Sequence, residues 1–320
     1  MENIDLLIRK LLADLPKELE NDTFYELITN CYTDFIGEIE KISEDELNTL
    51  LKLSSEITGN KTKLRLINLI KCIQNNCLRI LQYAYMGDIL NALKHLENLL
   101  MYQKYTQNKL KDYYVNYFRT ETYNQDFYRC VDFNCDEKKE NINCWHVPFN
   151  QREKASRNRF NQSGFPCFYL ASSKSCANKE IGHEPMCGKK RWCGKYHQTK
   201  NLYYLDFSLP NIETMSSYDK FAFFITYPIR LMCLVKVNNK EKNFCEEYMF
   251  SQLFFHILFM HKNDKFPQID GIKYISMFDR EATCVVIPAK YETQIPPKDG
   301  YSSFVQSSFK EIGNLEEIYN

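Results

Sequence analysis

The sequence lacks both a net charge and a long apolar segment. Its 41 basic and 41 acidic residues give a formal net charge of zero, so no global electrostatic field favours nucleic acid or a membrane surface as a partner. It contains no run of 18 apolar residues, which a transmembrane helix would require. The first fifteen residues mix charged and apolar side chains and lack the apolar core of a signal peptide. The sequence therefore predicts a cytoplasmic protein with no membrane partner, and it argues against nucleic acid.

The glycine-rich loops of common nucleotide-binding folds are missing as well. No GxGxxG motif follows an expected strand, and no GxxxxGK[ST] loop is present, so neither a standard dinucleotide fold nor a P-loop NTPase is predicted. Disulfides are not expected either. The 13 cysteines are an odd number in a chain without an export signal, and cytosolic cysteines are usually thiols or metal ligands.

Residues 1–118 contain little glycine or proline, and their apolar residues follow a helical period. The first repeat of this kind consists of Ile4, Leu7, Ile8, Leu11, Leu12 and Leu15. Ser43, with Glu46 three residues later, fits a capping box. Asp88 can cap the helix that follows Gly87. The pattern predicts an α-helical domain of four to six helices over residues 1–118, with nothing in it that looks catalytic.

The composition changes near residue 119, where aromatic residues, cysteines and short β-like runs replace the leucine periodicity. Strands are expected at residues 127–131, 166–171, 202–209, 231–237, 271–277 and 284–288. A largely buried helix is expected at residues 246–260. After Pro296 and Pro297 we expect a polar, irregular tail and a short last helix. The second half, residues 119–320, is therefore predicted to be an α+β domain.

Two groups of cysteine and histidine are candidate zinc sites. The first consists of Cys130, Cys135, Cys144 and His146, and the second of His183, Cys187, Cys193 and His197. Zinc needs four converging sulfur or nitrogen ligands, and neither group has the paired CxxC spacing that is typical of such sites. Free thiols are the alternative for both groups. The basic run at residues 189–191 is expected to lie in a solvated loop rather than to face RNA.

Residues 159–180 combine three kinds of side chain that could line one pocket. Arg159 lies in a polar loop, a turn follows at Ser163 and Gly164, and the next expected strand carries Tyr169. A helix of small residues then presents Glu180. Arginine can bind phosphate with two parallel hydrogen bonds, and a carboxylate can stabilise positive charge that develops on a ribose. On residue type alone, Arg159 could instead pair with any acid, and Glu180 could be a surface residue.

From about residue 127 to residue 290 the sequence resembles the RES domain, a family named for its arginine, glutamate and serine. The resemblance is carried, in order, by Phe127-Tyr128-Arg129, His146-Val147-Pro148-Phe149, Arg152, Arg159-Phe160, Gly164-x-Pro166, Phe168-Tyr169-Leu170-Ala171 through Glu180, Tyr227-Pro228, Glu247-Tyr248, Ser251-Gln252-Leu253 and Asp270 to Ser276. The sequence departs from the family at Asn158, where glycine is frequent, and at Asn161, where serine is frequent. Residues 182–200 look like a local elaboration.

The resemblance implies a fold and an activity. The fold would be α+β, with an all-α N-terminal helical domain, residues 1–118, followed by an ADP-ribosyltransferase-like RES domain, residues 119–320. The activity would be that of an NAD glycohydrolase or phosphorylase, in a bacterial toxin or antiphage effector. NAD would be the substrate and water or phosphate the attacking group. No metal would be required, because the positively charged nicotinamide is already a good leaving group.

The resemblance also implies roles for individual residues. Arg129 and Arg159 would hold the pyrophosphate or shape the nicotinamide-ribose pocket. Tyr169 would stack on the nicotinamide or its ribose. Glu180 would orient the ribose and stabilise the oxocarbenium-like state, and Ser276 would form a hydrogen bond in the same pocket.

Two other functions remain open from the sequence. One is a protein ADP-ribosyltransferase on the same fold. The other is a non-enzymatic nucleic-acid-binding module with zinc at His183, Cys187, Cys193 and His197. The helical domain would restrain, assemble or trigger the second domain, so an antitoxin, an activating protein and a homo-oligomer are candidate partners.

Overall fold

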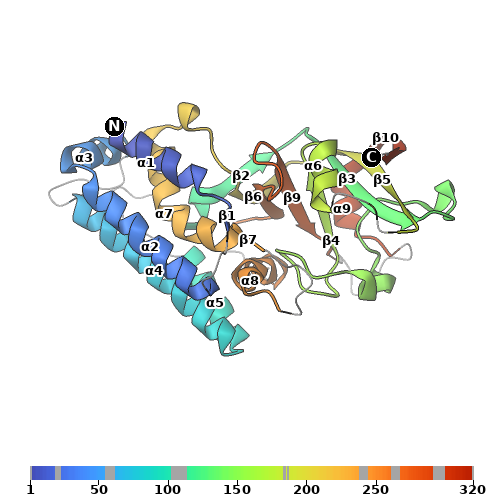
Figure 1. The fold of residues 1–320 in the computed structure, drawn as a ribbon, viewed down its shortest axis with the longest axis horizontal. Helices are drawn as coiled ribbons and strands as arrows, with labels where there is room; N and C mark the ends of the chain where they lie inside the picture. Colours follow the sequence, from blue (N-terminus) through green and yellow to red (C-terminus); the bar gives the residue numbers. More distant parts are fainter. Residues whose placement is uncertain are drawn as a thin grey trace. The chain divides into compact units, whose positions relative to one another are not determined.

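The computed structural model describes residues 2–18, 23–54, 62–101, 114–182, 185, 187–237, 244–260, 267–290 and 300–318. The chain forms two compact units (Figure 1). Unit 1 contains Met1–Phe118 and Leu209–Ile257, and unit 2 contains Arg119–Ser208 and Leu258–Asn320. Within the described ranges, no helix has both the length and the apolar character needed to cross a membrane.

Unit 1 is almost entirely helical. Its elements are α1 (Glu2–Ala13), β1 (Lys17–Glu18), α2 (Phe24–Lys41), α3 (Glu44–Ser54), α4 (Thr62–Tyr85), α5 (Ile89–Leu100), η1 (Tyr114–Phe118), η4 (Ile212–Thr214), α7 (Ser217–Cys233), β7 (Val235–Lys236) and most of α8 (Glu246–Met260). The predicted caps are present, since Ser43 Oγ accepts a hydrogen bond from the Glu46 amide at 3.2 Å and Asp88 caps α5. The helical prediction for the N-terminal part is confirmed.

Helix α7 corrects one prediction. A strand was expected at residues 231–237, but α7 continues to Cys233, and only Val235 and Lys236 pair as a strand, parallel to β1. All residues of α7 from Lys220 to Cys233 are buried, and the helix contacts α2, α3 and α4. A fully buried helix has no polar face, so its sequence cannot be distinguished from a buried strand by periodicity. The predicted helix at residues 246–260 is confirmed as α8.

The grouping of the chain differs from the predicted division in one respect. Residues 209–257 belong by sequence to the predicted second domain, 119–320, whereas in the structure they group with the N-terminal helices. The boundary between residues 118 and 119 coincides with the end of the first segment of unit 1. The two-domain assignment itself stays a prediction.

Unit 2 is built on an eight-stranded sheet with the order β10-β5-β3-β4-β9-β8-β6-β2. The strands are β2 (Arg119–Thr122), β3 (Asp126–Asn134), β4 (Cys167–Ala171), β5 (Lys189–Gln198), β6 (Leu202–Phe207), β8 (Gly271–Ile275), β9 (Thr283–Pro288) and β10 (Phe309–Ile318). The helical elements are η2 (Lys139–Asn141), η3 (Phe149–Lys154), α6 (Lys174–Glu180) and α9 (Ser303–Ser308). Neighbouring strands are antiparallel except β6 and β8, which are parallel. With the helices of unit 1, this sheet confirms the predicted α+β class.

Strand alternation gives this sheet two different faces. In the pairing of β4 with β9, Phe168 lies opposite Ile287 and Leu170 opposite Val285. These residues belong to an apolar cluster, called here the core face, and the paired side chains of an antiparallel ladder share one side of the sheet. The remaining members of this cluster are Phe127, Ile142, Cys144, Trp192, Tyr196, Leu202, Tyr204, Val305 and Phe309. The intervening residues, among them Tyr169 and Cys284, point to the opposite side, called here the site face.

Three strands of unit 2, β2, β5 and β10, were missed in the sequence. Residues 189–191 were expected in a solvated loop, but they open β5, and Arg191 is only 1% exposed. A short last helix was expected near the end. The helix α9 is followed by β10, which pairs with β5. The side chains of β10 are mostly half-buried or exposed, so the strand carries little of the alternation that would reveal it.

Candidate functional site

Glu180 is held at the end of a short, well-anchored helix on the site face. Helix α6 follows β4 directly, and Ser173 caps it by accepting a hydrogen bond from the Cys176 amide at 3.1 Å. The other end of α6 is fixed by Arg191 of β5. The Nη1 atom of Arg191 donates to Asn178 Oδ1 at 2.7 Å and to the Gly182 carbonyl at 2.6 Å.

Arg191 itself is locked in place. Its Nε and Nη2 atoms donate to the two carboxylate oxygens of Asp132 at 2.7 and 3.1 Å, and its side chain is fully buried. Such a two-point pair fixes orientation as well as charge. Arg191 is thus a positioning residue for the helix that carries Glu180. Nothing in the sequence indicated this role, because the run Lys189-Lys190-Arg191 looks uniformly solvated.

Ser276 and Glu180 meet although 96 positions separate them in the chain. The Ser276 hydroxyl donates to Glu180 Oε1 at 2.6 Å. Its oxygen also accepts hydrogen bonds from the amides of Phe278 at 3.1 Å and Asp279 at 3.2 Å. Two amides directed at the oxygen orient the single hydroxyl proton towards Glu180. Ser276 is fully buried and Glu180 half-buried, so the carboxylate keeps a path to solvent.

Two thiols lie beside this pair. Cys284 Sγ, on β9, is 3.7 Å from Glu180 Oε1, and Cys176 Sγ, on α6, is 3.9 Å from Cys284 Sγ. The hydrogen bond to Cys176, burial and the Glu180 carboxylate raise the pKa of Cys284 well above its usual value. The hydrogen bond from Cys284 lowers the pKa of Cys176, against the effect of burial. Of the two thiols, Cys176 is therefore the one that loses its proton first as the pH rises.

Arg159 is presented by a tight turn. Asn158 and Asn161 pair across it through their main chains, at 3.0 and 3.3 Å. Tyr169 fastens the turn to β4, because its hydroxyl donates to Asn161 Oδ1 at 2.8 Å and accepts from the Phe160 amide at 3.3 Å. Arg159 is 6% exposed and Asn161 2%. Asn161, a departure from the family pattern, is thus a support for the turn that carries Arg159.

Tyr274 lies near Glu180, Cys284 and Arg159, and no role was predicted for it from the sequence. It lies on β8, two positions before Ser276, and its ring contacts that of Phe160 at 5.0 Å between centroids. Burial raises the pKa of Tyr274 well above its usual value, and smaller contributions come from Cys284, Glu180 and Tyr169, with an opposing one from Arg159. Tyr274 also lies opposite Cys284 in the pairing of β8 with β9, which puts its side chain on the site face with these groups. The two-residue spacing from Ser276 was the signal that could have identified it.

Arg129 lies apart from this group. Alternation along β3 puts it on the side of Phe127, the core face. Its guanidinium lies 5.8 Å from the centroid of the Phe168 ring, and its Nη1 atom donates to the Tyr169 carbonyl at 3.0 Å. Burial lowers the pKa of Arg129. Its Nε atom is buried and has no hydrogen-bond partner in the part of the chain that the structure describes.

The position of Arg129 matters because β3 and β4 barely pair. They share only Tyr128 opposite Ala171, whereas β3 and β5 pair at nine positions. The Arg129 side chain therefore supplies a second link across the gap, and it does so at the carbonyl of Tyr169. The structure brings Arg159, Tyr169, Glu180 and Ser276 together, and it connects Arg129 to them through the backbone of β4.

Neither predicted zinc group converges among the described residues. Cys193 lies opposite Cys130 on β5 and β3, His197 Nδ1 lies 2.7 Å from Asp126 Oδ1, and Cys187 is exposed. His183 lies outside the described residues.

In the first group, Cys144 is buried in the core face and Cys135 is exposed. His146 Nε2 accepts a hydrogen bond from the Ser302 amide at 2.9 Å. In the described ranges, the group that does bring three ligand atoms within 4.8 Å of one another is Cys176, Glu180 and Cys284.

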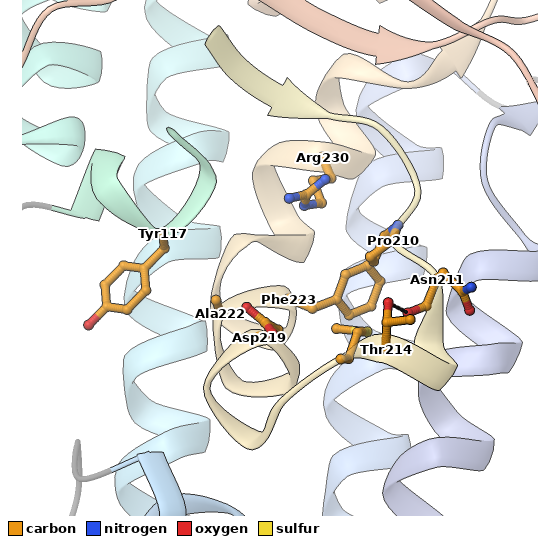
Figure 2. Close-up of a pocket in the computed structure, with 9 residues that line it drawn as sticks. Tyr117, Pro210, Asn211, Thr214, Asp219, Ala222, Phe223 and Arg230 are labelled. Atoms are coloured by element: carbon orange, nitrogen blue, oxygen red, sulfur yellow. Dashed lines mark hydrogen bonds between the residues drawn. The ribbon is translucent and has the colours of Figure 1, made fainter. Parts of the chain in front are cut away.

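Unit 1 contains a cavity of about 320 Å³ that the sequence did not predict (Figure 2). Its lining residues are Tyr117, Pro210, Asn211, Thr214, Met215, Asp219, Ala222, Phe223 and Arg230. Arg230 is buried, donates to Thr226 Oγ1 at 3.1 Å and lies 5.9 Å from the Phe223 ring centroid. Asp219 is engaged in capping α7 through Ser216. Because the Asp219 carboxylate is engaged by Ser216, we do not assign it a role as an acid or base. The cavity is better suited to binding a ligand than to acid–base chemistry.

Comparison with known proteins matches most of the sheet unit together with residues 209–257 of unit 1. A family model described as the RES domain matches residues 127–299, more than half of the chain. The match contains Arg129, Arg159, Tyr169, Glu180 and Ser276. A curated protein of Bacillus subtilis (strain 168), named "Putative toxin YopC", is 24% identical over 279 residues, which cover 82% of this chain and 58% of that protein. The chain thus spans somewhat over half the length of this curated relative.

Proposed function

Because the chain belongs to the RES domain family, we propose that it is an enzyme that consumes NAD by breaking the bond between nicotinamide and ribose, and that it acts as a toxin. The observation that carries the first part is the 2.6 Å hydrogen bond from Ser276 to Glu180. The word toxin in the name of the Bacillus subtilis relative supports the second part.

The chemistry of the bond explains why a carboxylate is needed. When nicotinamide leaves, the ribose carbon develops positive charge, and a fixed negative group beside it stabilises that state more than the ground state. Ser276 and Cys284 both contact Oε1 of Glu180. We therefore assign Oε2 to the ribose hydroxyls. Ser276 keeps the carboxylate in one orientation, which is the preorganisation that such electrostatic stabilisation requires.

The arginine supplies the opposite charge. NAD carries a pyrophosphate, and an arginine fork matches phosphate oxygens in geometry and charge. Arg159 precedes Phe160, whose ring contacts that of Tyr274, and Tyr274 lies opposite Cys284, which contacts Glu180. A substrate with phosphate at one end and ribose at the other would thus bridge Arg159 and Glu180. Tyr169 would bind through its ring, since its hydroxyl holds the turn.

No metal ion is needed for this step. The nicotinamide of NAD is a cationic ring that leaves as a neutral molecule, so no Lewis acid is required to assist its departure. Water or inorganic phosphate would then attack the ribose carbon. Because Arg129 lies on the core face and its Nη1 atom is engaged at the Tyr169 carbonyl, we propose that it shapes the pocket by holding β4 and does not contact the substrate.

The test is NAD consumption by the purified full chain. Nicotinamide release is measured with and without inorganic phosphate, for the unmodified protein and for Glu180→Gln and Arg159→Lys. Matched controls are Glu121→Gln and Arg119→Lys, which change the same residue types on β2. We expect nicotinamide release to fall in the two site variants and to persist in the two controls. Acceleration by phosphate indicates phosphorolysis.

Two outcomes would contradict the proposal. NAD that stays intact with the unmodified protein, also in cells that express it, would overturn NAD consumption. Equal loss of activity in Glu121→Gln and Glu180→Gln would remove the site assignment. Labelled ADP-ribose appearing on a protein, rather than free in solution, would instead select the protein ADP-ribosyltransferase reading. A toxin also implies a restraining partner, and growth arrest on expression that a co-expressed protein relieves would identify one.

A further inference from the structure

The two thiols beside Glu180 are not used in the proposed reaction, yet they are arranged around its carboxylate. We propose that Cys176, Glu180 and Cys284 form a binding site for a thiophilic divalent cation of the zinc type, and that the bound ion inhibits the site. The second clause rests on the proposed function, and the first does not. The three ligand atoms all lie within 4.8 Å of one another.

The distances fit a tetrahedral ion. With Zn–S bonds of about 2.3 Å and a Zn–O bond of about 2.1 Å, a tetrahedral centre separates two sulfurs by about 3.8 Å and a sulfur from an oxygen by about 3.6 Å. The observed Sγ–Sγ distance between Cys176 and Cys284 is 3.9 Å, and Cys284 Sγ lies 3.7 Å from Glu180 Oε1. These two separations need to change by only about 0.1 Å to accept the ion. The third, between Cys176 Sγ and the Glu180 oxygen, lies within 4.8 Å.

The ligands come from rigid elements that are already in place. Cys176 and Glu180 are four residues apart on α6, which puts both side chains on one face of the helix. Cys284 lies on β9, between β4 and β8 in the sheet. Ser173 caps the start of α6 and Arg191 fixes its end. A site whose ligands need no reorganisation binds more tightly than one that must be assembled.

The choice of ion follows from the donor atoms. Two thiolates select zinc-like ions over magnesium and calcium, which prefer oxygen ligands. On binding, both thiols release their protons to solvent. Three protein ligands leave the fourth position for water, as in zinc sites that are not closed. The alternative is a disulfide between Cys176 and Cys284. A disulfide would not involve Glu180 Oε1, whereas a metal ion would use this oxygen as its third ligand, so the position of Oε1 favours the ion.

The bound ion would compete with the proposed reaction. It would take Oε1 of Glu180, the oxygen that accepts the Ser276 proton in the metal-free site. Zinc brings two positive charges and the two thiols release two protons, so the net charge of the group is unchanged, but the carboxylate would donate to the ion and lose the hydrogen bond that orients it. Loss of that orientation and of a free carboxylate removes the stabilisation of the ribose cation, so zinc would act as a reversible inhibitor whose effect a chelator removes.

Metal binding is tested first without reference to activity. The full chain, reduced with a phosphine and stripped with a chelator, is titrated with cobalt(II), and the thiolate-to-cobalt absorption band is recorded. One equivalent of cobalt with a band typical of two thiolates is expected, and added zinc should displace it while magnesium should not. The band should vanish in Cys176→Ser and Cys284→Ser and weaken in Glu180→Gln.

The matched control is Cys187→Ser, which removes an exposed thiol of the group that the sequence suggested. It should leave the cobalt band unchanged. A band that persists in Cys284→Ser, or disappears in Cys187→Ser, would overturn the proposed site, and so would the absence of any band. Glu180 is half-buried, so its glutamine variant tests the site even where a buried cysteine variant folds poorly.

Inhibition is tested second. Each folded variant is assayed for whatever nicotinamide release it retains, over a range of buffered zinc concentrations. Cys284→Ser should require at least ten times more zinc for half inhibition than the unmodified protein, and Cys187→Ser should require the same amount. Equal sensitivity of all three would overturn the inhibitory role. If the chain releases no nicotinamide, the proposed function fails while the cobalt titration still decides the metal site.

Discussion

The two faces of the sheet in unit 2 differ in what their side chains do. On the core face, Phe168 and Leu170 of β4 pack against apolar and aromatic neighbours. On the site face, the same strands present Tyr169 and Cys284 towards Tyr274, Arg159 and Glu180. Successive residues of one strand thus serve two purposes, because strand side chains alternate between faces. Residues that stabilise the sheet and residues of the candidate site are therefore separated by a single step along the chain.

The largest effect is expected on the core face. Phe168 is fully buried, and its ring contacts those of Trp145, Tyr196 and Phe309. Phe168→Ala should destabilise unit 2 by about 3–5 kcal/mol, because it removes buried surface and leaves a cavity. Urea unfolding followed by tyrosine and tryptophan fluorescence measures it. A loss below 1 kcal/mol would show that the core face does not support the sheet.

The next effect is expected on the site face and in activity rather than stability. Glu180→Gln should lower kcat for nicotinamide release on the order of 100-fold, equivalent to about 2.7 kcal/mol, because a neutral amide cannot stabilise the ribose cation. Its unfolding midpoint should stay close to that of the unmodified protein. A variant that loses activity and stability together would break the separation between the two faces.

A smaller effect is expected for Tyr169, whose hydroxyl holds the turn that carries Arg159. Tyr169→Phe keeps the ring but removes the proton that Asn161 Oδ1 accepts. Leaving that buried acceptor unsatisfied costs about 1–3 kcal/mol, and we expect part of it to appear as a raised KM because the turn also carries Arg159. An unchanged KM in this variant would contradict this expectation.

The smallest effect is expected away from the sheet. Asp88→Ala removes the cap of α5 in unit 1 and should cost about 1 kcal/mol of stability. It touches neither face of the sheet, so nicotinamide release should remain at the level of the unmodified protein. Thermal unfolding and the activity assay together check both statements. Reduced activity here would indicate that unit 1 influences the site.

The sequence predicted those elements whose local pattern agrees with their tertiary surroundings. The helix at residues 246–260 and the strands β3, β4, β6, β8 and β9 were found because apolar residues mark them. Helix α7 was partly mistaken for a strand because burial on all sides removes the polar positions that define a period. Strand β10 was missed for the opposite reason, since it buries too little to show one.

The site was predictable only as a set of residue types. Family resemblance selected Glu180 and Ser276, and the structure brings them within hydrogen-bond distance. Spacing along the chain suggested zinc at Cys187, Cys193 and their neighbours. Spacing measures separation along the chain and not distance in space, so it could not show that these side chains fail to converge. Cys176 and Cys284 are 108 residues apart, and no local pattern connects them. Arg191 was overlooked since its partner Asp132 lies 59 positions away.

The order of the strands has a consequence for the synthesis of this protein. Strand β9 lies between β4 and β8 near the middle of the sheet, yet it is formed by Thr283–Pro288, far along the chain. Glu180 leaves the ribosome about a hundred residues before Ser276 and Cys284 do. Until then β4 lacks one neighbour, and the carboxylate lacks the hydroxyl that orients it. A nascent chain therefore carries every arginine of the site but no assembled pocket, so the activity proposed here would begin only once the sheet has closed.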